Sequence, residues 1–196
     1  MNKTLITLGV IGVIILILYF FFAGRYNNMV NKSVDTKTKW AMVESQYQRR
    51  MDLFSNVVNT IKGSAEFEKS TLEAVINARA KATSIQVDPS KLTPESIQQY
   101  QQAQNNLSSS FSRLLVTVEQ YPQLQTTAAF RDFQAQIEGT ENRINKARDD
   151  FNTSVQDYNS YIMRFPSNIL AGMYGFKEKG YFQATPGSEK APEVKF

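Results

Sequence analysis

The chain has 196 residues and a formal net charge of +4, and it contains neither cysteine nor histidine. It therefore forms no disulfide and has no Cys/His metal site, no thiolate nucleophile and no imidazole base. The sequence also lacks a P-loop, a dinucleotide-binding fingerprint and a nucleophile elbow, so we expect no enzyme, no cofactor and no metal.

The first element is an apolar run from Thr4 to Ala23 without a charged residue or proline. A helix of this length spans about 30 Å, the thickness of the hydrocarbon core of a bilayer. The run is longer than the apolar core of a secretory signal, and its end lacks the small residues of a cleavage site. We expect a retained membrane anchor with its ends at Thr4 and Ala23. No later run is long enough to span, so the protein is predicted to be single-pass.

Positive charge gathers near this span. Residues 1–62 carry eight Lys or Arg against three Asp or Glu, and most of these cations follow the span. The positive-inside rule favours a cytoplasmic C-terminal domain, although a periplasmic or extracellular domain stays open.

A long helix is predicted to follow, up to the stop at Lys62-Gly63. Its apolar residues recur every three or four positions and define one face: Trp40, Val43, Tyr47, Met51, Phe54, Val58 and Ile61. Trp40, the single tryptophan, is expected in the core. Because Gly24 is the only breaker, the anchor should continue into this helix as one stiff rod.

The second and third helices are predicted at residues 64–83 and 94–120, joined by an exposed connection. Thr93 and Pro94 suit the N-cap and first position of the third helix. The second helix has Phe67, Leu72, Val75, Ile76 and Ala80 as its expected inner side. The inner side of the third consists of Ile97, Tyr100, Leu107, Phe111, Leu114, Leu115 and Val118.

The fourth helix has the most regular pattern and is predicted at residues 124–164. Its core positions recur every seven residues: Phe130, Ile137, Ile144, Phe151, Tyr158 and Phe165. Phe133, Ala147, Val155 and Ile162 fill the positions between them. Such a repeat indicates a helix packed along its whole length. Phe165-Pro166 should end it.

The last residues, 167–196, contain several glycines and prolines and are not expected to be helical as a whole. Their aromatic residues are too numerous for a disordered linker. We expect part of this tail to pack on the bundle or on a neighbouring subunit. The aromatics are Tyr174, Phe176, Tyr181, Phe182 and Phe196.

Two groups of polar residues are candidates for interaction sites. Charged residues of the first and fourth long helices suit surface or interhelical ion pairs, with a partner contact as the alternative. They are Arg49, Arg50 and Asp52, with Glu141, Arg143 and Arg148. The second group is a row of asparagines that recur every seven residues beside the packed face of the fourth helix: Asn145, Asn152 and Asn159. Their amides either make lateral hydrogen bonds or simply face solvent.

Several sequence blocks resemble LemA family proteins. They are YNNMVNKSV (26–34), WAMVESQYQRRMDLFSNVVNTIKGSAEFE (40–68), EQYPQL (119–124), ENRINKARDDFNTSVQDYNSYIMRFP (141–166), AGMYGFKEKGYFQA (171–184) and APEVKF (191–196). The blocks occur in the family's order and cover nearly the whole chain after the span.

The resemblance implies a bacterial membrane protein with a short N-terminal segment, one membrane helix and a long antiparallel helical bundle. It implies residence in the cytoplasmic (inner) membrane and no defined activity. Members are linked by genome context to TPM-domain proteins and membrane metallopeptidases, which are possible partners here. One branch is similar to proteins needed for magnetosome membranes. The family has no catalytic residue to carry over.

The sequence thus predicts an all-α protein of about four bundle helices. Residues 1–24 form the anchor, 25–166 the antiparallel bundle and 167–196 the irregular tail. The leading hypothesis is a non-enzymatic scaffold or assembly protein that contacts the lipid bilayer, forms a homo-oligomer and binds no nucleic acid. The alternative is a membrane-bound sensor or ligand-binding bundle.

Overall fold

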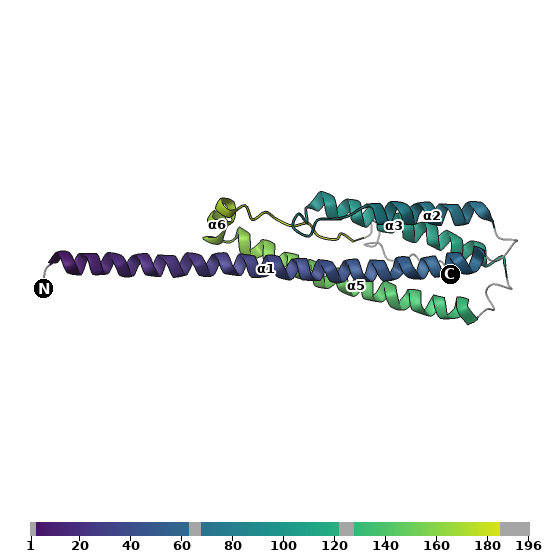
Figure 1. The fold of residues 1–196 in the computed structure, drawn as a ribbon, viewed down its shortest axis with the longest axis horizontal. Coiled ribbons are helices and arrows are strands. Elements are labelled where there is room, and N and C mark those ends of the chain that lie inside the picture. The colour runs from purple at the N-terminus through teal and green to yellow at the C-terminus, as the bar shows by residue number, and fades with distance from the viewer. Residues whose placement is uncertain (1–2, 63–67, 122–127, 185–196) are drawn as a thin grey trace, which may run out of the picture.

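The fold is that of a computed structural model, and its description covers residues 3–62, 68–121 and 128–184. Every regular element in these ranges is a helix, which confirms the all-α prediction (Figure 1). The helices are α1 (Lys3–Lys62), α2 (Lys69–Ser84), α3 (Pro94–Val118), α5 (Ala128–Met163) and α6 (Ser167–Tyr174).

Helix α1 runs without a break for 60 residues, or about 90 Å. Its first part projects beyond the bundle, and the apolar window found there has no buried residue (Figure 1). Gly24 lies within the helix and does not interrupt it. The predicted continuation of the apolar run into the first bundle helix is therefore confirmed. In the described part of the chain, α1 is the one helix that is long and apolar enough to cross a membrane.

The bundle consists of two antiparallel pairs, α1 with α5 and α2 with α3 (Figure 1). Aromatic side chains join the pairs. The ring of Phe54 on α1 stacks on that of Phe111 on α3, with centroids 3.7 Å apart. Phe133 on α5 contacts the same Phe111 ring at 5.4 Å. These contacts build one core between the helices.

The core has three apolar clusters along the bundle. The cluster farthest from the N-terminus surrounds Phe54 and Phe111, and the middle cluster surrounds Trp40. The cluster nearest the projecting part of α1 joins Met29 to Tyr158, Ile162 and Leu170. Trp40 is fully buried, as predicted. The predicted inner sides of α1 and α3 are also buried, except that Leu115 is only half-buried.

Helix α2 departs from its predicted inner side. It begins at Lys69, later than expected, and packs mainly on α3. Ile76 and Ala80 are exposed, while Ala82 is buried. A short helix with one principal neighbour buries a narrower stripe than the periodicity indicated. The predicted inner residue Phe67 lies outside the described residues.

The connection between α2 and α3 is not exposed throughout. Val87 and Leu92 are buried and complete the middle cluster beside Trp40. Residues 88–90 predict a turn, and Val87 and Leu92 on either side of it do not follow a helical spacing. The sequence pattern therefore gave no indication that these two side chains are buried. The cap prediction is confirmed, because the Thr93 side chain accepts a hydrogen bond from the Ser96 amide at 3.2 Å.

Helix α5 ends at Met163 and buries its predicted heptad positions from Phe130 to Tyr158, except that Ile137 is only half-buried. Phe165, the next heptad position, is 77% exposed, so its assignment to the core was wrong. The helix has already ended at this position, and the following Pro166 leads into α6. The predicted start at Leu124 lies outside the described residues.

Candidate functional site

Residues 177–184, here called the tail segment, lie extended along the bundle after α6. Figure 1 shows this yellow part of the chain leaving α6 and running back beside the helices. Phe182 is buried among residues of the middle cluster. The described part of the tail therefore packs on its own bundle, which is one of the two predicted arrangements.

Two asparagines of α5 bind the main chain of the tail segment. The Nδ2 atom of Asn159 donates to the Lys179 carbonyl, and its Oδ1 atom accepts from the Lys179 amide, both at 2.9 Å. Asn152 makes the same pair of bonds to Phe182, again at 2.9 Å. Each side-chain amide thus replaces a neighbouring β-strand for one residue of the tail.

A third amide comes from α3. Gln101 Nε2 donates to the Gln183 carbonyl at 2.7 Å, and the Gln183 amide donates back to Gln101 Oε1 at 3.1 Å. Arg148 on α5 donates to the same carbonyl at 2.9 Å. Because these groups bind main-chain atoms, they recognise extended backbone whatever side chains it carries.

Two contacts set the register of the tail segment, one through a side chain and one through the main chain. Phe182 stacks on Trp40 with the two ring planes inclined by 13°. Gly180 donates from its amide to the Leu92 carbonyl at 2.8 Å. A Cβ atom at Gly180 would lie 2.5 Å from the Pro94 Cα atom. Only glycine fits this close approach of two main chains.

Lys179 places a buried ammonium group against α1. Its Nζ atom donates to the carbonyl and hydroxyl oxygens of Ser33 at 3.2 and 3.1 Å, and to the Thr36 hydroxyl. The Nζ atom also lies 4.5 Å from the centroid of the Tyr158 ring. Burial, with a smaller effect from the charge of Lys37, lowers the pKa of Lys179 to about 8.

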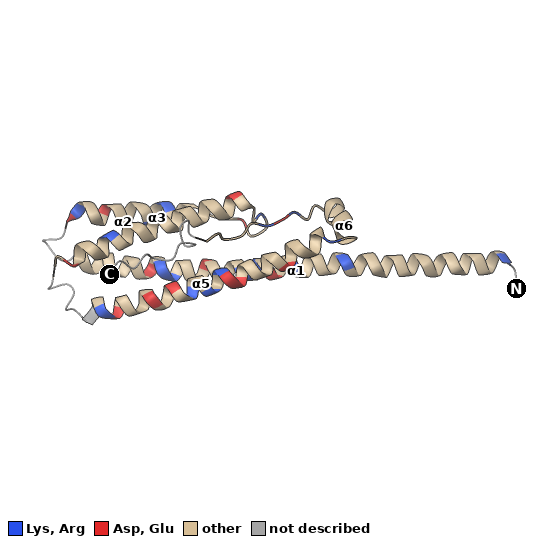
Figure 2. Ribbon diagram, turned by 180° about the vertical axis from the view of Figure 1, so that it is seen from behind, with Lys and Arg blue, Asp and Glu red and all other residues tan. Residues whose placement is uncertain are grey.

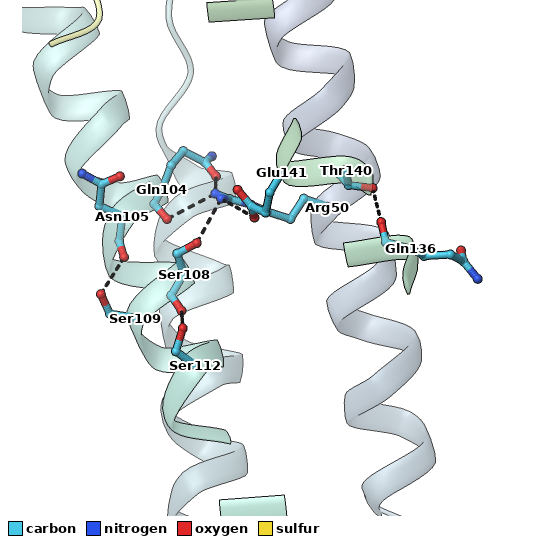
Figure 3. Close-up of polar contacts among 9 residues, drawn as sticks. All are labelled: Arg50, Gln104, Asn105, Ser108, Ser109, Ser112, Gln136, Thr140 and Glu141. Carbon is cyan, nitrogen blue, oxygen red and sulfur yellow. Dashed lines mark hydrogen bonds and ion pairs between the residues drawn. The ribbon is translucent and has the colours of Figure 1, made fainter. Parts of the chain in front are cut away.

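A second polar centre surrounds Arg50, which reaches from α1 into the core and is 3% exposed (Figure 3). Its Nη2 atom donates to the Gln104 side-chain oxygen at 2.6 Å and to the Gln104 carbonyl at 3.2 Å. Its Nη1 atom donates to Ser108 at 3.1 Å and to Glu141 at 3.2 Å. The guanidinium thus joins α1, α3 and α5.

The buried charge of Arg50 is also held by aromatic rings. Its guanidinium carbon lies 4.8 Å from the Tyr47 ring centroid and 5.8 Å from that of Phe54. Desolvation by burial raises the pKa of Tyr47 despite the neighbouring positive charges. Arg50 therefore faces a neutral phenol, neutral amides and one carboxylate. This arrangement can fix the helices relative to one another, and it offers no acid or base pair.

The structure separates the other charged candidates. Arg49 and Asp52 are exposed, and Asp52 accepts a hydrogen bond from Gln48 of its own helix at 3.0 Å. Arg50 and Glu141 form an ion pair between α1 and α5. Lys69 with Glu73 and Lys146 with Asp150, also in the described part of the chain, form ion pairs within single helices. Arg143 lines a shallow hollow between α1 and α5.

Asn145 continues the asparagine stripe one heptad beyond Asn152 and is exposed. It lines an open polar hollow of about 450 Å³ together with Arg148, Asp149 and the last described residues of the tail. The stripe is therefore not a uniform solvent-facing row: two of its members bind the tail, and the third lies where the described tail ends.

Sequence reasoning missed Gln101, Lys179 and Gly180 as binding residues. The sequence did contain one signal. The distance along α5 between successive asparagines of the stripe nearly equals the length of three residues of extended chain. Seven helical residues rise about 10.5 Å, and three extended residues rise about 10 Å. An asparagine stripe of this spacing can therefore pair with every third residue of an extended segment.

A family model describing the LemA family matches residues 39–196, which is well over half of the chain. The chain belongs to the LemA family. The matched range includes the asparagine stripe, Arg50 and the tail segment. The resemblance stated from the sequence blocks is thus confirmed.

Similar proteins agree with this assignment. Magnetosome protein MamQ 2 of Paramagnetospirillum magneticum (strain AMB-1) is 28% identical over 186 residues, covering 84% of this chain and 67% of that protein. Magnetosome protein MamQ of Magnetospirillum gryphiswaldense (strain MSR-1) is 27% identical with the same coverage. Protein LemA of Metamycoplasma hominis (strain PG21) is 24% identical over 169 residues, covering 86% of this chain and 74% of that protein.

The LemA family assignment and the apolar N-terminal helix support a membrane-associated protein. The names of these relatives do not denote enzymes. Membership in the LemA family leaves the biochemical role undefined.

Proposed function

We propose that this protein is a non-enzymatic, single-pass scaffold of a bacterial cytoplasmic membrane, which holds a protein-binding surface at a fixed height. The unbroken 60-residue helix α1 carries this proposal. A helix that leaves the bilayer and becomes the central rod of a bundle transmits its position and tilt to the whole domain. A flexible tether would hold a partner near the membrane without orienting it.

The contact between copies of the scaffold is assigned to the face of α1 and α5 around Met42. Met42 is 48% exposed, and it lines a shallow hollow of about 400 Å³ with Arg143, Lys146 and Asp150. Both signs of charge surround the apolar centre. Such a patch can match itself in a two-fold dimer, where each surface meets an identical one.

Disulfide crosslinking tests this contact in the native membrane. The chain has no cysteine, so Met42→Cys introduces a single thiol. We expect oxidation to give a covalent dimer of the full-length protein. Val116→Cys on α3 is the matched control, because Val116 is exposed and lies away from the hollow. Monomer in both variants, together with a strictly monomeric mass in mild detergent, would overturn the scaffold proposal.

The bundle is proposed to face the cytoplasm, because Arg25, Lys32 and Lys37 follow the span and Lys3 alone precedes it among the charged side chains. Trypsin added to intact spheroplasts should leave the bundle uncut until the membrane is lysed. Digestion before lysis would place the bundle on the outer side.

A further inference from the structure

The end of the bundle nearest the projecting part of α1 exposes a group of large apolar side chains. Phe165 and Met173 are exposed by 77% and 73%. Ile169, Tyr174 and Met163 are each more than half exposed. These five residues, here called the α6 patch, lie within twelve positions of the sequence. Single exposed apolar side chains are common, but a group of this kind usually marks a binding surface.

Helix α6 uses one side for the bundle and leaves the other uncovered. Leu170 and Ala171 are buried in the cluster of Met29. Ile169 and Met173 are four residues apart, so they share another side of the helix, and both are exposed. The buried side attaches α6 to the bundle, and the side with Ile169 and Met173 remains available for another contact.

The position of α6 along α1 identifies what can cover this patch. Arg25 donates from Nη1 to the Ser167 hydroxyl at 3.3 Å. The ring of Tyr26 lies 4.9 Å from that of Tyr174 and 5.8 Å from that of Phe176. Arg25 and Tyr26 follow the end of the span at Ala23 by no more than three residues, or about 5 Å of helix. Helix α6 thus lies beside the part of α1 that directly follows the apolar run, where the projecting part of α1 meets the bundle (Figure 1).

The charges at this level suit a lipid surface. Residues 24–34 and 163–177 contain no Asp or Glu, and they include Arg25, Lys32, Arg164 and Lys177. The first acidic residue of α1 is Asp35. The projecting part of α1 has blue segments and no red one in Figure 2. Cations beside aromatic and aliphatic side chains are the composition of interfacial helices, and anionic headgroups attract such cations.

We propose that α6 and Phe165 lie in the interfacial region of the bilayer, as a second membrane contact beside the span. This inference rests on the proposed spanning of residues 4–23. A single helix leaves the bundle free to rotate about its axis and to tilt. A second contact on one side of that axis restricts the tilt of the bundle, because leaning away from that side would lift α6 out of the interfacial region.

Spin labels on the full-length protein test this placement. Because the chain has no cysteine, single cysteines can carry a nitroxide at Ile14, Met173 or Val116, all of which are exposed. The variants are reconstituted at high dilution in vesicles of phosphatidylethanolamine and phosphatidylglycerol. Collisions with oxygen report lipid, and collisions with a water-soluble nickel chelate report water.

We expect the label at Ile14 to contact oxygen strongly and the label at Val116 to contact the nickel chelate strongly. The label at Met173 should give a depth between these two. If Met173 matches Val116 while Ile14 remains deep, the α6 inference fails and the anchor stands. If Ile14 is exposed to the chelate, the anchor itself fails. Spin-spin broadening at Met173 that persists at high dilution would show that a second copy covers the patch, which also overturns the inference.

Discussion

Asn159 on α5 and Lys179 in the tail segment form two hydrogen bonds, both 2.9 Å long, between one side-chain amide and the main-chain N–H and C=O of one residue. Asn152 repeats this arrangement with Phe182. Seven residues of helix and three of extended chain have nearly equal rise, so the same helix face can bind the tail repeatedly without strain. The tail segment is therefore bound as a peptide ligand of the bundle would be.

Replacement of Asn159 should release the tail. Asn159→Ala leaves the buried amide of Lys179 without a partner, which costs about 1–3 kcal/mol. We expect faster hydrogen exchange throughout residues 177–184 and a lower melting temperature. Asn145→Ala is the matched control, because Asn145 is exposed and lies beyond the described tail. Equal exchange rates in the two variants would show that the asparagine stripe does not hold the tail.

A methyl group at Gly180 should disturb the same contact. Gly180→Ala forces a Cβ atom against the main chain of Pro94, and overpacking of this kind typically costs about 1–3 kcal/mol. We expect a lower melting temperature and faster trypsin cleavage at Lys177 and Lys179. Gly172→Ala is the control, since a Cβ at Gly172 meets nothing within 4 Å and alanine favours a helix. A fully stable Gly180→Ala variant would contradict the close approach.

The tail should bind more tightly as the pH rises above about 8. Burial lowers the pKa of Lys179 to about 8, against 10.5 for a free lysine. Between these values the unfolded chain binds more protons than the folded chain, so stability increases with pH. Burial raises the pKa of Tyr158 to about 12, so the facing phenol stays neutral in this range.

The measurement is the free energy of unfolding of the native chain and of Lys179→Met from pH 7 to 10.5. Above pH 8 the free energy of unfolding of the native chain should increase relative to that of Lys179→Met. Below pH 8 the difference between the two free energies should stay constant. A difference independent of pH would show that the ammonium group is not desolvated by docking.

Removal of the buried guanidinium should destabilise the bundle. Arg50→Met leaves Gln104 and Ser108 without their donor, and we expect a loss of about 2–4 kcal/mol by denaturant unfolding. Arg50→Lys should not restore the native value, because the two guanidinium nitrogens bind four oxygen atoms, and a single ammonium nitrogen with three protons cannot replace both. Arg49→Met, at an exposed site of the same helix, should stay within about 0.5 kcal/mol of the native chain. Similar losses at positions 49 and 50 would contradict the burial of Arg50.

Helical features were predictable because their signals are local. The continuity of α1 follows from the absence of strong breakers, and the cap at Thr93 follows from a short motif. The asparagine stripe was visible for the same reason, as a repeat within one helix. The boundaries of α2 and the exposure of Phe165 were not visible, because they depend on which neighbours a helix has and where it ends.

The binding partners of the candidate residues were not predictable. Gln101 and Gln183 are 82 positions apart, and Lys179 lies 143 positions from Thr36. An extended segment has no helical period that could indicate which groove it occupies. A buried lysine also looks like any surface lysine until its oxygen partners on another element are known.

The central claim is that anchor and bundle share one rigid helix, and a distance measured across Gly24 tests it most directly. Val10 and Val34 are both exposed, and as cysteines they can carry a nitroxide pair in the full-length protein in vesicles. A straight helix places these positions about 36 Å apart. The account predicts one narrow distance distribution near this value. A broad distribution, or one centred at a much shorter distance, would show a hinge at Gly24 and contradict the claim.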